Sequence, residues 1–189
     1  MNKSSEIDSL DDLELLRQIS EDQNKLALAE LYDRYRHSLG SFIRRKVYQD
    51  KLVDEIYNDV MLTVWQKAAS FRAESKVSTW IFGIAHRICL SQSRKEMKHT
   101  QNMTDIEFDA LQAKPSEGEN EADIVDHLRI ATSKLKENHR TVIELTYFHG
   151  HTLAEIAEIV RCPVNTVKTR LFHARRSLKD SLTKYAVNH

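Results

Sequence analysis

The stretch HGHTLAEIAEIVRCPVNTVKTRLFHARRSL, residues 149–178, has the pattern of two amphipathic helices joined by a short turn. Apolar residues in its first half repeat at the i, i+3, i+4 and i+7 spacing of one helix face: Leu153, Ile156, Ala157 and Val160. Proline cannot continue a helix, so a turn of about three residues is predicted at Arg161, Cys162 and Pro163. The second half predicts another helix, whose apolar face comprises Val164, Val167, Leu171, Ala174 and Leu178.

The residues before this pair indicate where its first helix starts. Thr152 and Glu155 have the spacing of a capping box, in which a hydroxyl accepts an amide hydrogen three residues on and a carboxylate reaches back. Gly150 is a natural cap for a preceding helix, predicted over residues 135–148 with Val142, Leu145 and Phe148 on its apolar face. The small side chain of Ala157 lets the two helices of the pair cross closely. Together these features predict a helix-turn-helix.

A helix-turn-helix places the start of its second helix in the major groove of DNA. The candidate readers of base edges are Asn165, Thr166, Lys168 and Thr169. The candidate phosphate contacts lie further along: Arg170, His173, Arg175 and Arg176. An ordinary helical hairpin with a solvated basic face is the alternative. The motif also does not distinguish a repressor or activator from other DNA-binding proteins.

The formal net charge of zero is an average over unlike parts of the chain. Residues 1–95 hold 15 Lys and Arg against 14 Asp and Glu, residues 96–123 hold 2 against 8, and residues 124–189 hold 11 against 6. Between residues 161 and 184, Asp180 is the one acidic residue among seven basic ones. This local excess is the electrostatic footprint that phosphate binding needs.

Apolar periodicity fades over residues 96–123, which are rich in Asp, Glu, Asn and Ser. Such a composition predicts an acidic flexible linker, about 30 Å across as a coil and about 90 Å when stretched. We therefore predict two domains, residues 1–95 and residues 124–189, that can reach separate sites on one DNA molecule. Four glycines and two prolines in 189 residues favour an all-α fold for both.

Three segments of the first domain carry helical periodicity and can close a small core. The first stripe comprises Leu28, Leu31, Tyr32, Tyr35, Leu39, Phe42, Ile43 and Val47. The second comprises Val53, Ile56, Tyr57, Val60 and Val64. The third comprises Val77, Trp80, Ile81, Ile84, Ala85 and Ile88.

Composition also excludes several classes of protein. No apolar run is long enough to span a bilayer, and the acidic start is unlike a secretory signal, so we expect a cytoplasmic protein without membrane insertion. Cys89 and Cys162 fall in apolar patterns without a close partner, which favours reduced thiols. No glycine-rich phosphate loop or nucleophile elbow occurs, so neither an enzyme nor a bound cofactor is expected.

The stretch at residues 149–178 resembles region 4 of the extracytoplasmic-function (ECF) group of sigma-70 factors. The matching residues are Gly150, Glu155, Ile156, Ala157, Pro163, Thr166, Val167, Lys168, Arg170, Leu171, Ala174, Arg175 and Leu178. Arg161 and Asn165 stand where that group usually has glycine, and His173 stands where it usually has arginine. The resemblance implies that this domain binds the minus-35 promoter element.

The stretch VDEIYNDVMLTVWQKAASFRAESKVSTWIFGIAHR, residues 53–87, resembles sigma region 2. The resemblance implies a surface for the coiled coil of the polymerase β′ clamp, with candidates Asp54, Asn58, Asp59, Met61 and Trp65. It also implies a loop and helix that melt the minus-10 element and capture an unstacked base. The candidates there are Arg72, Ser75, Lys76, Thr79, Trp80, His86 and Arg87. The alternative, on pattern alone, is that both tryptophans belong to the core and that Asp54, Asn58 and Asp59 form a solvated helix face.

Taken as a whole, the resemblance implies an alternative sigma factor that acts in a stress response. Its implied partners are core RNA polymerase, through the β′ clamp and the β flap, promoter DNA, and an anti-sigma factor of the zinc-binding kind. Two rival hypotheses have less support. A metal site at His149, His151, Cys162 and His173 lacks the paired spacing of zinc ligands, and a plain DNA-binding regulator leaves the region 2 resemblance unexplained.

Overall fold

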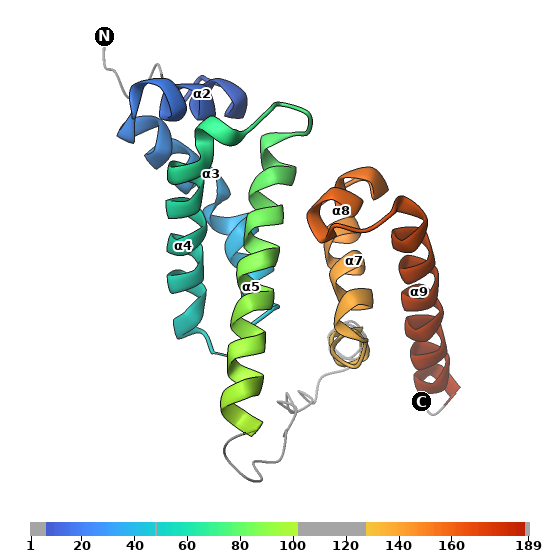
Figure 1. The fold of residues 1–189 in the computed structure, drawn as a ribbon. Helices are drawn as coiled ribbons and strands as arrows, with labels where there is room; N and C mark the ends of the chain where they lie inside the picture. The colour runs from blue at the N-terminus through green and yellow to red at the C-terminus, as the bar shows by residue number, and fades with distance from the viewer. Residues whose placement is uncertain (1–6, 48, 102–127, 188–189) are drawn as a thin grey trace. The chain divides into compact units, whose positions relative to one another are not determined.

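The computed structural model describes residues 7–47, 49–101 and 128–187, and within these ranges all regular structure is helical. The chain divides into two compact units, the first built around α2 to α5 and the second around α7 and α9 (Figure 1). The predicted all-α fold is confirmed. In the part of the chain that is described, no helix combines the length and apolar character needed to cross a membrane.

Among the described residues, four helices and a short 3-10 turn form most of the first unit. They are α2 (Asp12–Asp22), α3 (Lys25–Arg44), α4 (Lys51–Lys67), η1 (Ala68–Ser70) and α5 (Val77–Gln101). Helix α4 packs against both α3 and α5. The three predicted apolar stripes supply most of this core, with the side chains of Leu31, Leu39, Phe42, Ile43, Val60, Val64, Ile81 and Ala85 fully buried.

Helix α2 is an addition to the three predicted helical segments of this unit. Its buried residues Leu15, Leu16 and Ile19 are at most 2% exposed, and burying each contributes roughly 2 kcal/mol. Asp11 caps the helix by accepting a hydrogen bond from the backbone N–H of Glu14 at 2.8 Å. The predicted set was incomplete because the apolar run of α2 is too short to show several helical turns.

Polar contacts also hold α2 on α3. The Asp12 carboxylate accepts a hydrogen bond from Arg34 at 2.6 Å and another from the Tyr35 hydroxyl. The pKa of Tyr35 is raised above its usual value, mainly by burial and also by the neighbouring Asp12 carboxylate. The phenol therefore stays protonated and keeps donating to Asp12 throughout the physiological pH range.

The second unit contains α7 (Glu137–Tyr147), most of α8 (Leu153–Val160) and α9 (Val164–Val187), and residues 128–133 are also helical. Helices α7 and α9 pack against each other. Val142, Leu145, Ile156, Val167 and Ala174 are buried as their spacing predicts. Two residues assigned to the apolar faces are instead exposed, because Phe148 follows the last turn of α7 and Val164 begins α9.

Helix α5 continues to Gln101, six residues beyond the predicted end of the first domain at residue 95. The residues after Arg94 are mostly Lys, Glu, Met and Gln, which are good helix formers even without an apolar stripe. Most of the predicted linker, residues 102–123, lies outside the described residues.

Candidate polymerase and nucleic-acid interfaces

The turn between α8 and α9 consists of residues 161–163, as predicted. The N–H of Cys162 donates to the carbonyl of Ala157 at 3.0 Å, and the N–H of Arg161 donates to the carbonyl of Glu158 at 3.3 Å. This pair of bonds is a Schellman motif, which satisfies the last carbonyls of a helix and ends it abruptly. The motif sets the angle at which α9 leaves α8.

The start of α8 is fixed by the predicted capping box. The N–H of Thr152 donates to Oε2 of Glu155 at 2.8 Å, and the N–H of Glu155 donates to Oγ1 of Thr152 at 3.3 Å. Gly150 precedes it with a φ of +67°, a conformation that only glycine adopts without steric cost. Both ends of α8 are therefore held by their own local sequence, and the helix-turn-helix prediction is confirmed.

Arg161 occupies the left-handed position of the Schellman motif, with a φ of +51°. A left-handed conformation costs a non-glycine residue about 1–2 kcal/mol. We expect Arg161→Gly to stabilise the chain by about 0.5–1 kcal/mol, because the greater freedom of unfolded glycine offsets part of the gain. Urea denaturation of wild type, Arg161→Gly and Arg161→Ala checks this. If Arg161→Ala stabilised the chain equally, the cause would be the loss of the positive charge and not the relief of the left-handed backbone conformation.

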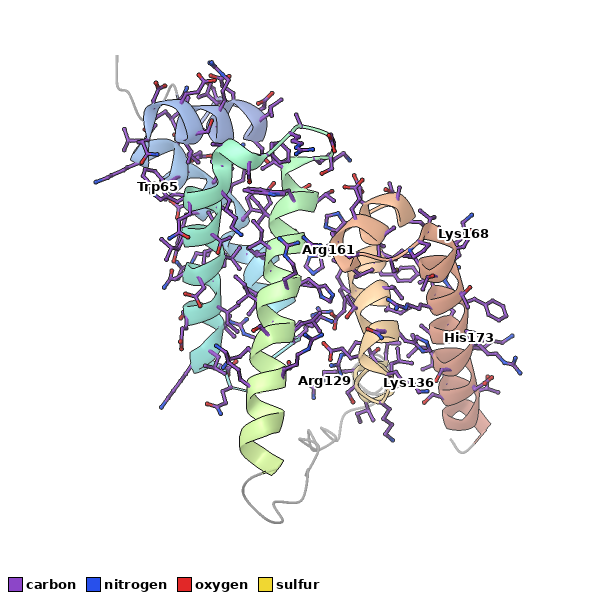
Figure 2. The ribbon with its side chains drawn as sticks, in the orientation of Figure 1. Trp65, Arg129, Lys136, Arg161, Lys168 and His173 are labelled. Carbon is purple, nitrogen blue, oxygen red and sulfur yellow. The ribbon has the colours of Figure 1, made fainter. Side chains whose placement is uncertain are left out.

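Most of the predicted DNA-binding residues of α9 lie on its surface, and Figure 2 shows Lys168 and His173 along this helix. The exposed ones are Asn165, Lys168, Thr169, His173, Arg175 and Arg176. Thr166 and Arg170 are half-buried. The hydroxyl of Thr169 donates to the carbonyl of Asn165 at 3.0 Å, so toward a partner its oxygen can only accept, while its methyl group can make apolar contacts.

Two of the predicted phosphate contacts also hold α9 on its neighbours. Nη1 of Arg170 donates to Sγ of Cys162 at 3.8 Å, which links α9 to the turn before it. Nε of Arg175 donates to the Tyr147 hydroxyl at 2.6 Å, and its guanidinium lies 5.5 Å from the centre of that ring. These arginines therefore orient the helix in addition to supplying positive charge.

Phe172 is a surface residue that the sequence patterns did not single out. Its side chain is 62% exposed although it is large and apolar. It lies three and four residues after Thr169 and Lys168, and therefore on the same side of α9 as these candidate readers. The helical spacing to Thr169 and Lys168 is the feature of the sequence that could have predicted this position. A phenylalanine at such a place can contact the methyl group of thymine.

His173 stacks on His139 of α7, with ring centres 6.1 Å apart and planes 16° from parallel. The pKa of His139 is below its ordinary value. Partial burial is the largest cause, and the nearby His173, Lys136 and Arg170 lower it further. The folded chain therefore favours the neutral ring. Positive charge is already concentrated around it, so a proton added to His139 weakens the contact between α7 and α9.

We expect the free energy of unfolding to fall as the pH drops below about 6.5, the ordinary pKa of histidine, because the unfolded chain then binds more protons at His139. Above that pH His139 is neutral in both the folded and the unfolded chain, so the free energy of unfolding keeps its full value. Urea denaturation at pH 7.5 and pH 5.5 measures the loss, and His139→Gln should reduce it. An identical pH dependence in wild type and variant would contradict the assignment to His139.

The predicted minus-10 residues divide by exposure. Arg72 and Lys76 are exposed, and Ser75, Trp80 and Arg87 are half-buried. Trp80 packs on Phe71 with ring centres 5.4 Å apart, so it belongs partly to the core. Thr79 and His86 are only 2% and 6% exposed. Both lie on α5, beside Trp80 and Arg87, and both remain candidates for this site.

A pocket of about 460 Å³ lies beside the loop before α5. Ser75 and Lys76 line it together with Phe71 and Ala73 of the same loop. Val77 and Ser78 at the start of α5 also line it, and the opposite wall comes from residues that the patterns did not assign to this site, namely Asp11, Asp12, Leu13 and Arg34. The loop therefore forms a pocket with α2 and α3, two helices that lie far from it in the sequence.

The candidate polymerase surface lies on α4. Asp54, Asn58 and Asp59 are exposed, and Trp65, labelled in Figure 2, is half-buried. Met61 is only 3% exposed, because its position on the helix turns it inward with Val60 and Val64. It is a core residue and we remove it from the candidate surface.

Leu62 is the apolar residue that α4 does present at its surface. It is 54% exposed, and it follows Asn58 and Asp59 by four and three residues, which places all three on one face. The family pattern pointed to position 61, whereas the helical register of the buried residues points to position 62. The face thus combines an amide, a carboxylate and an exposed apolar side chain.

Both units match descriptions of one protein family. Sigma-70 region 2 matches residues 31–99, and Sigma-70 region 4 matches residues 128–178. The chain is 26% identical to RNA polymerase sigma factor YlaC of Bacillus subtilis, over 84% of this chain and 93% of that protein. It is 27% identical to ECF RNA polymerase sigma factor SigK of Mycobacterium bovis, over 95% of each.

A solved structure shares the fold. It is the sigma factor RpoE in complex with the anti-sigma factor NepR from Bartonella quintana, with a TM-score of 0.64, 23% identity, and coverage of 77% of this chain and 90% of that one. The chain belongs to the sigma-70 family, with region 2 in the first unit and region 4 in the second. Within that family it is an ECF RNA polymerase sigma factor, a transcription initiation factor that is not itself an enzyme.

Proposed function

We propose that this ECF sigma factor directs core RNA polymerase to its promoters by dividing the work between its two units. The first unit docks on the β′ clamp and holds the melted minus-10 strand, and the second unit binds the minus-35 duplex. The observation that carries the proposal is that each unit exposes a different face: a helix-turn-helix with a basic α9, and an acidic and apolar face on α4.

The minus-35 assignment rests on α9. Its exposed Asn165, Lys168 and Thr169 lie near the N-terminal end, the part that enters the major groove in helix-turn-helix proteins. Arg176, further along, supplies charge for the phosphate backbone. The short turn and the capped α8 set the direction of α9 and therefore the side from which these side chains project.

The minus-10 assignment rests on the pocket beside the loop before α5. Arg72 and Lys76 provide positive charge where a single strand would pass, and Ser75 provides a polar edge for a base. A captured base needs a hollow lined by polar groups, and this open pocket of about 460 Å³ offers Ser75 and Lys76 in its wall. Arg34 and Asp12 also stand in the wall of this pocket, and Thr79, Trp80, His86 and Arg87 on α5 remain candidates for the same strand.

An apolar groove of about 680 Å³ on the second unit is the proposed site of the β flap. Its apolar lining comprises Leu128, Ile143, Tyr147, Phe148, Leu178 and Leu182. Arg175 and Lys179 are the basic residues of its lining. Such a groove suits an amphipathic helix: its apolar face would pack on the apolar lining, and acidic residues beside that face would pair with the basic residues. We assign that role to the polymerase β flap, the second contact predicted for the core enzyme.

Regulation by an anti-sigma factor is a further part of the proposal. The sigma factor RpoE of Bartonella quintana is similar in fold and was solved in complex with the anti-sigma factor NepR. The stretches DVMLTVWQKA and STWIFGIA of this chain resemble members controlled by zinc-binding anti-sigma proteins. We therefore propose a zinc-binding anti-sigma partner, a role in a stress response, and action in the cytoplasm. The acidic stretch at residues 96–123 would connect the two units inside the polymerase.

Run-off transcription on a library of promoter fragments tests the proposed function. Core enzyme alone should start few specific transcripts, and core enzyme with this chain should start transcripts from a defined subset of fragments. Those fragments should share one element near minus 35 and another near minus 10. A chain that shifts these fragments in a gel and yields no specific start would be a plain DNA-binding regulator, and the proposal would be wrong.

A further inference from the structure

The amide of Asn58 on α4 is held by a side chain of the neighbouring helix. The hydroxyl of Tyr32 on α3 donates a hydrogen bond to Oδ1 of Asn58, with the two oxygens 3.1 Å apart. Nη1 of Arg36 lies 3.4 Å from the same hydroxyl oxygen and donates to it. Since an arginine can only donate, the oxygen of Tyr32 accepts from Arg36 and its proton points to Asn58.

This direction determines which way the amide of Asn58 faces. The carbonyl oxygen is the end that accepts from Tyr32, so the NH₂ group lies at the other end and keeps both of its hydrogens. Asn58 itself is exposed. The amide therefore presents two hydrogen-bond donors from a surface that Asp54 and Asp59 otherwise make acidic.

Tyr32 is itself well fixed. Its ring meets the ring of Tyr57 edge to face, with centres 4.8 Å apart and an interplanar angle of 87°. The buried Tyr57 donates its hydroxyl to the backbone carbonyl of Tyr32. The guanidinium of Arg36 lies 5.8 Å from the centre of the Tyr32 ring. The series Tyr57, Tyr32 and Asn58 thus links the core of the first unit to the outer face of α4.

We infer that Tyr32 is a positioning residue for polymerase docking, which fixes the Asn58 amide with its donors toward acceptors on the core enzyme. The inference rests on the proposed role of the α4 face. An exposed asparagine ordinarily samples several rotamers and both amide orientations, and binding must then select one of them. The hydroxyl of Tyr32 makes that selection in advance, which lowers the entropic cost of association.

Tyr32→Phe removes the hydroxyl and keeps the ring on Tyr57. We expect the dissociation constant for core polymerase, measured by fluorescence anisotropy with labelled full-length chain, to rise about 3- to 10-fold. Asn58→Ala should also weaken binding. If Tyr32 acts through Asn58, the double variant should bind no more weakly than Asn58→Ala alone.

Tyr35→Phe on the same helix is the matched control, because it removes a hydroxyl bound to Asp12 and leaves the Asn58 contact intact. It should change the urea midpoint more than the affinity for core enzyme. Equal weakening by Tyr32→Phe in the wild-type and Asn58→Ala backgrounds would overturn the inference, as would an unchanged affinity in Tyr32→Phe. If neither Asn58→Ala nor Asp59→Lys alters core binding, the proposed α4 docking face itself is wrong, and the inference falls with it.

Discussion

Asp59→Lys is expected to weaken binding to core RNA polymerase about 100-fold, which corresponds to about 3 kcal/mol. Asp59 is exposed on α4 beside Asn58 and Leu62, at the centre of the proposed docking face. The substitution removes a carboxylate that can pair with a cation of the β′ clamp and puts a like charge in its place. A fluorescence titration of core enzyme against labelled chain measures the change.

Asp22→Lys is the control for this experiment, since it makes the same change of charge at an exposed site on α2. It should alter core affinity less than threefold or so, because long-range charge effects are screened in physiological salt. Asp59→Lys should leave minus-35 duplex binding intact, which shows that the second unit is unaffected. Equal losses in both variants would point to net charge and contradict a specific α4 face.

Lys168→Ala is expected to lower the affinity for a minus-35 duplex about 10-fold or more. Lys168 is exposed near the N-terminal end of α9, within one turn of Asn165 and next to Thr169. If its ammonium contacts a base edge, the loss depends on the sequence of the element. If it contacts a phosphate, every duplex loses affinity alike and the slope of log affinity against log salt falls by about 1.

Lys134→Ala provides the comparison for Lys168→Ala. Lys134 is exposed in the turn before α7, whereas the helix-turn-helix follows the other end of that helix. Gel-shift titrations at several salt concentrations should show little change in this variant. Core affinity should be nearly unchanged in both. A Lys168→Ala chain that binds minus-35 duplexes as well as wild type would remove α9 from the proposed interface.

Local signals in the sequence were enough to predict the helix-turn-helix. The capping box at Thr152 and Glu155, the proline at 163 and the glycine at 150 each act within a few residues, so their effect needs no knowledge of the rest of the fold. The left-handed backbone conformation of Arg161 could not be predicted from the sequence. The sequence has arginine where the family usually has glycine, and only the geometry shows that the left-handed conformation is retained.

Features that depend on packing were harder to predict. Helix α2 buries only Leu15, Leu16 and Ile19, which is too short a run to show a helical period. The helical residues 128–133 are also too few to show one. Met61 and Leu62 are adjacent and both apolar, and the choice between them depends on which side of α4 faces α3 and α5. The pocket beside Ser75 needs walls from α2 and α3, which lie far away in the sequence.

The central claim is that this chain opens promoter DNA only when core polymerase carries it. Permanganate, which oxidises unpaired thymines, measures this directly on a fragment selected by run-off transcription. With core enzyme and the chain together, thymines near minus 10 should become reactive, and neither component alone should produce that pattern. Reactive thymines with the chain alone, or none with both components present, would contradict the claim.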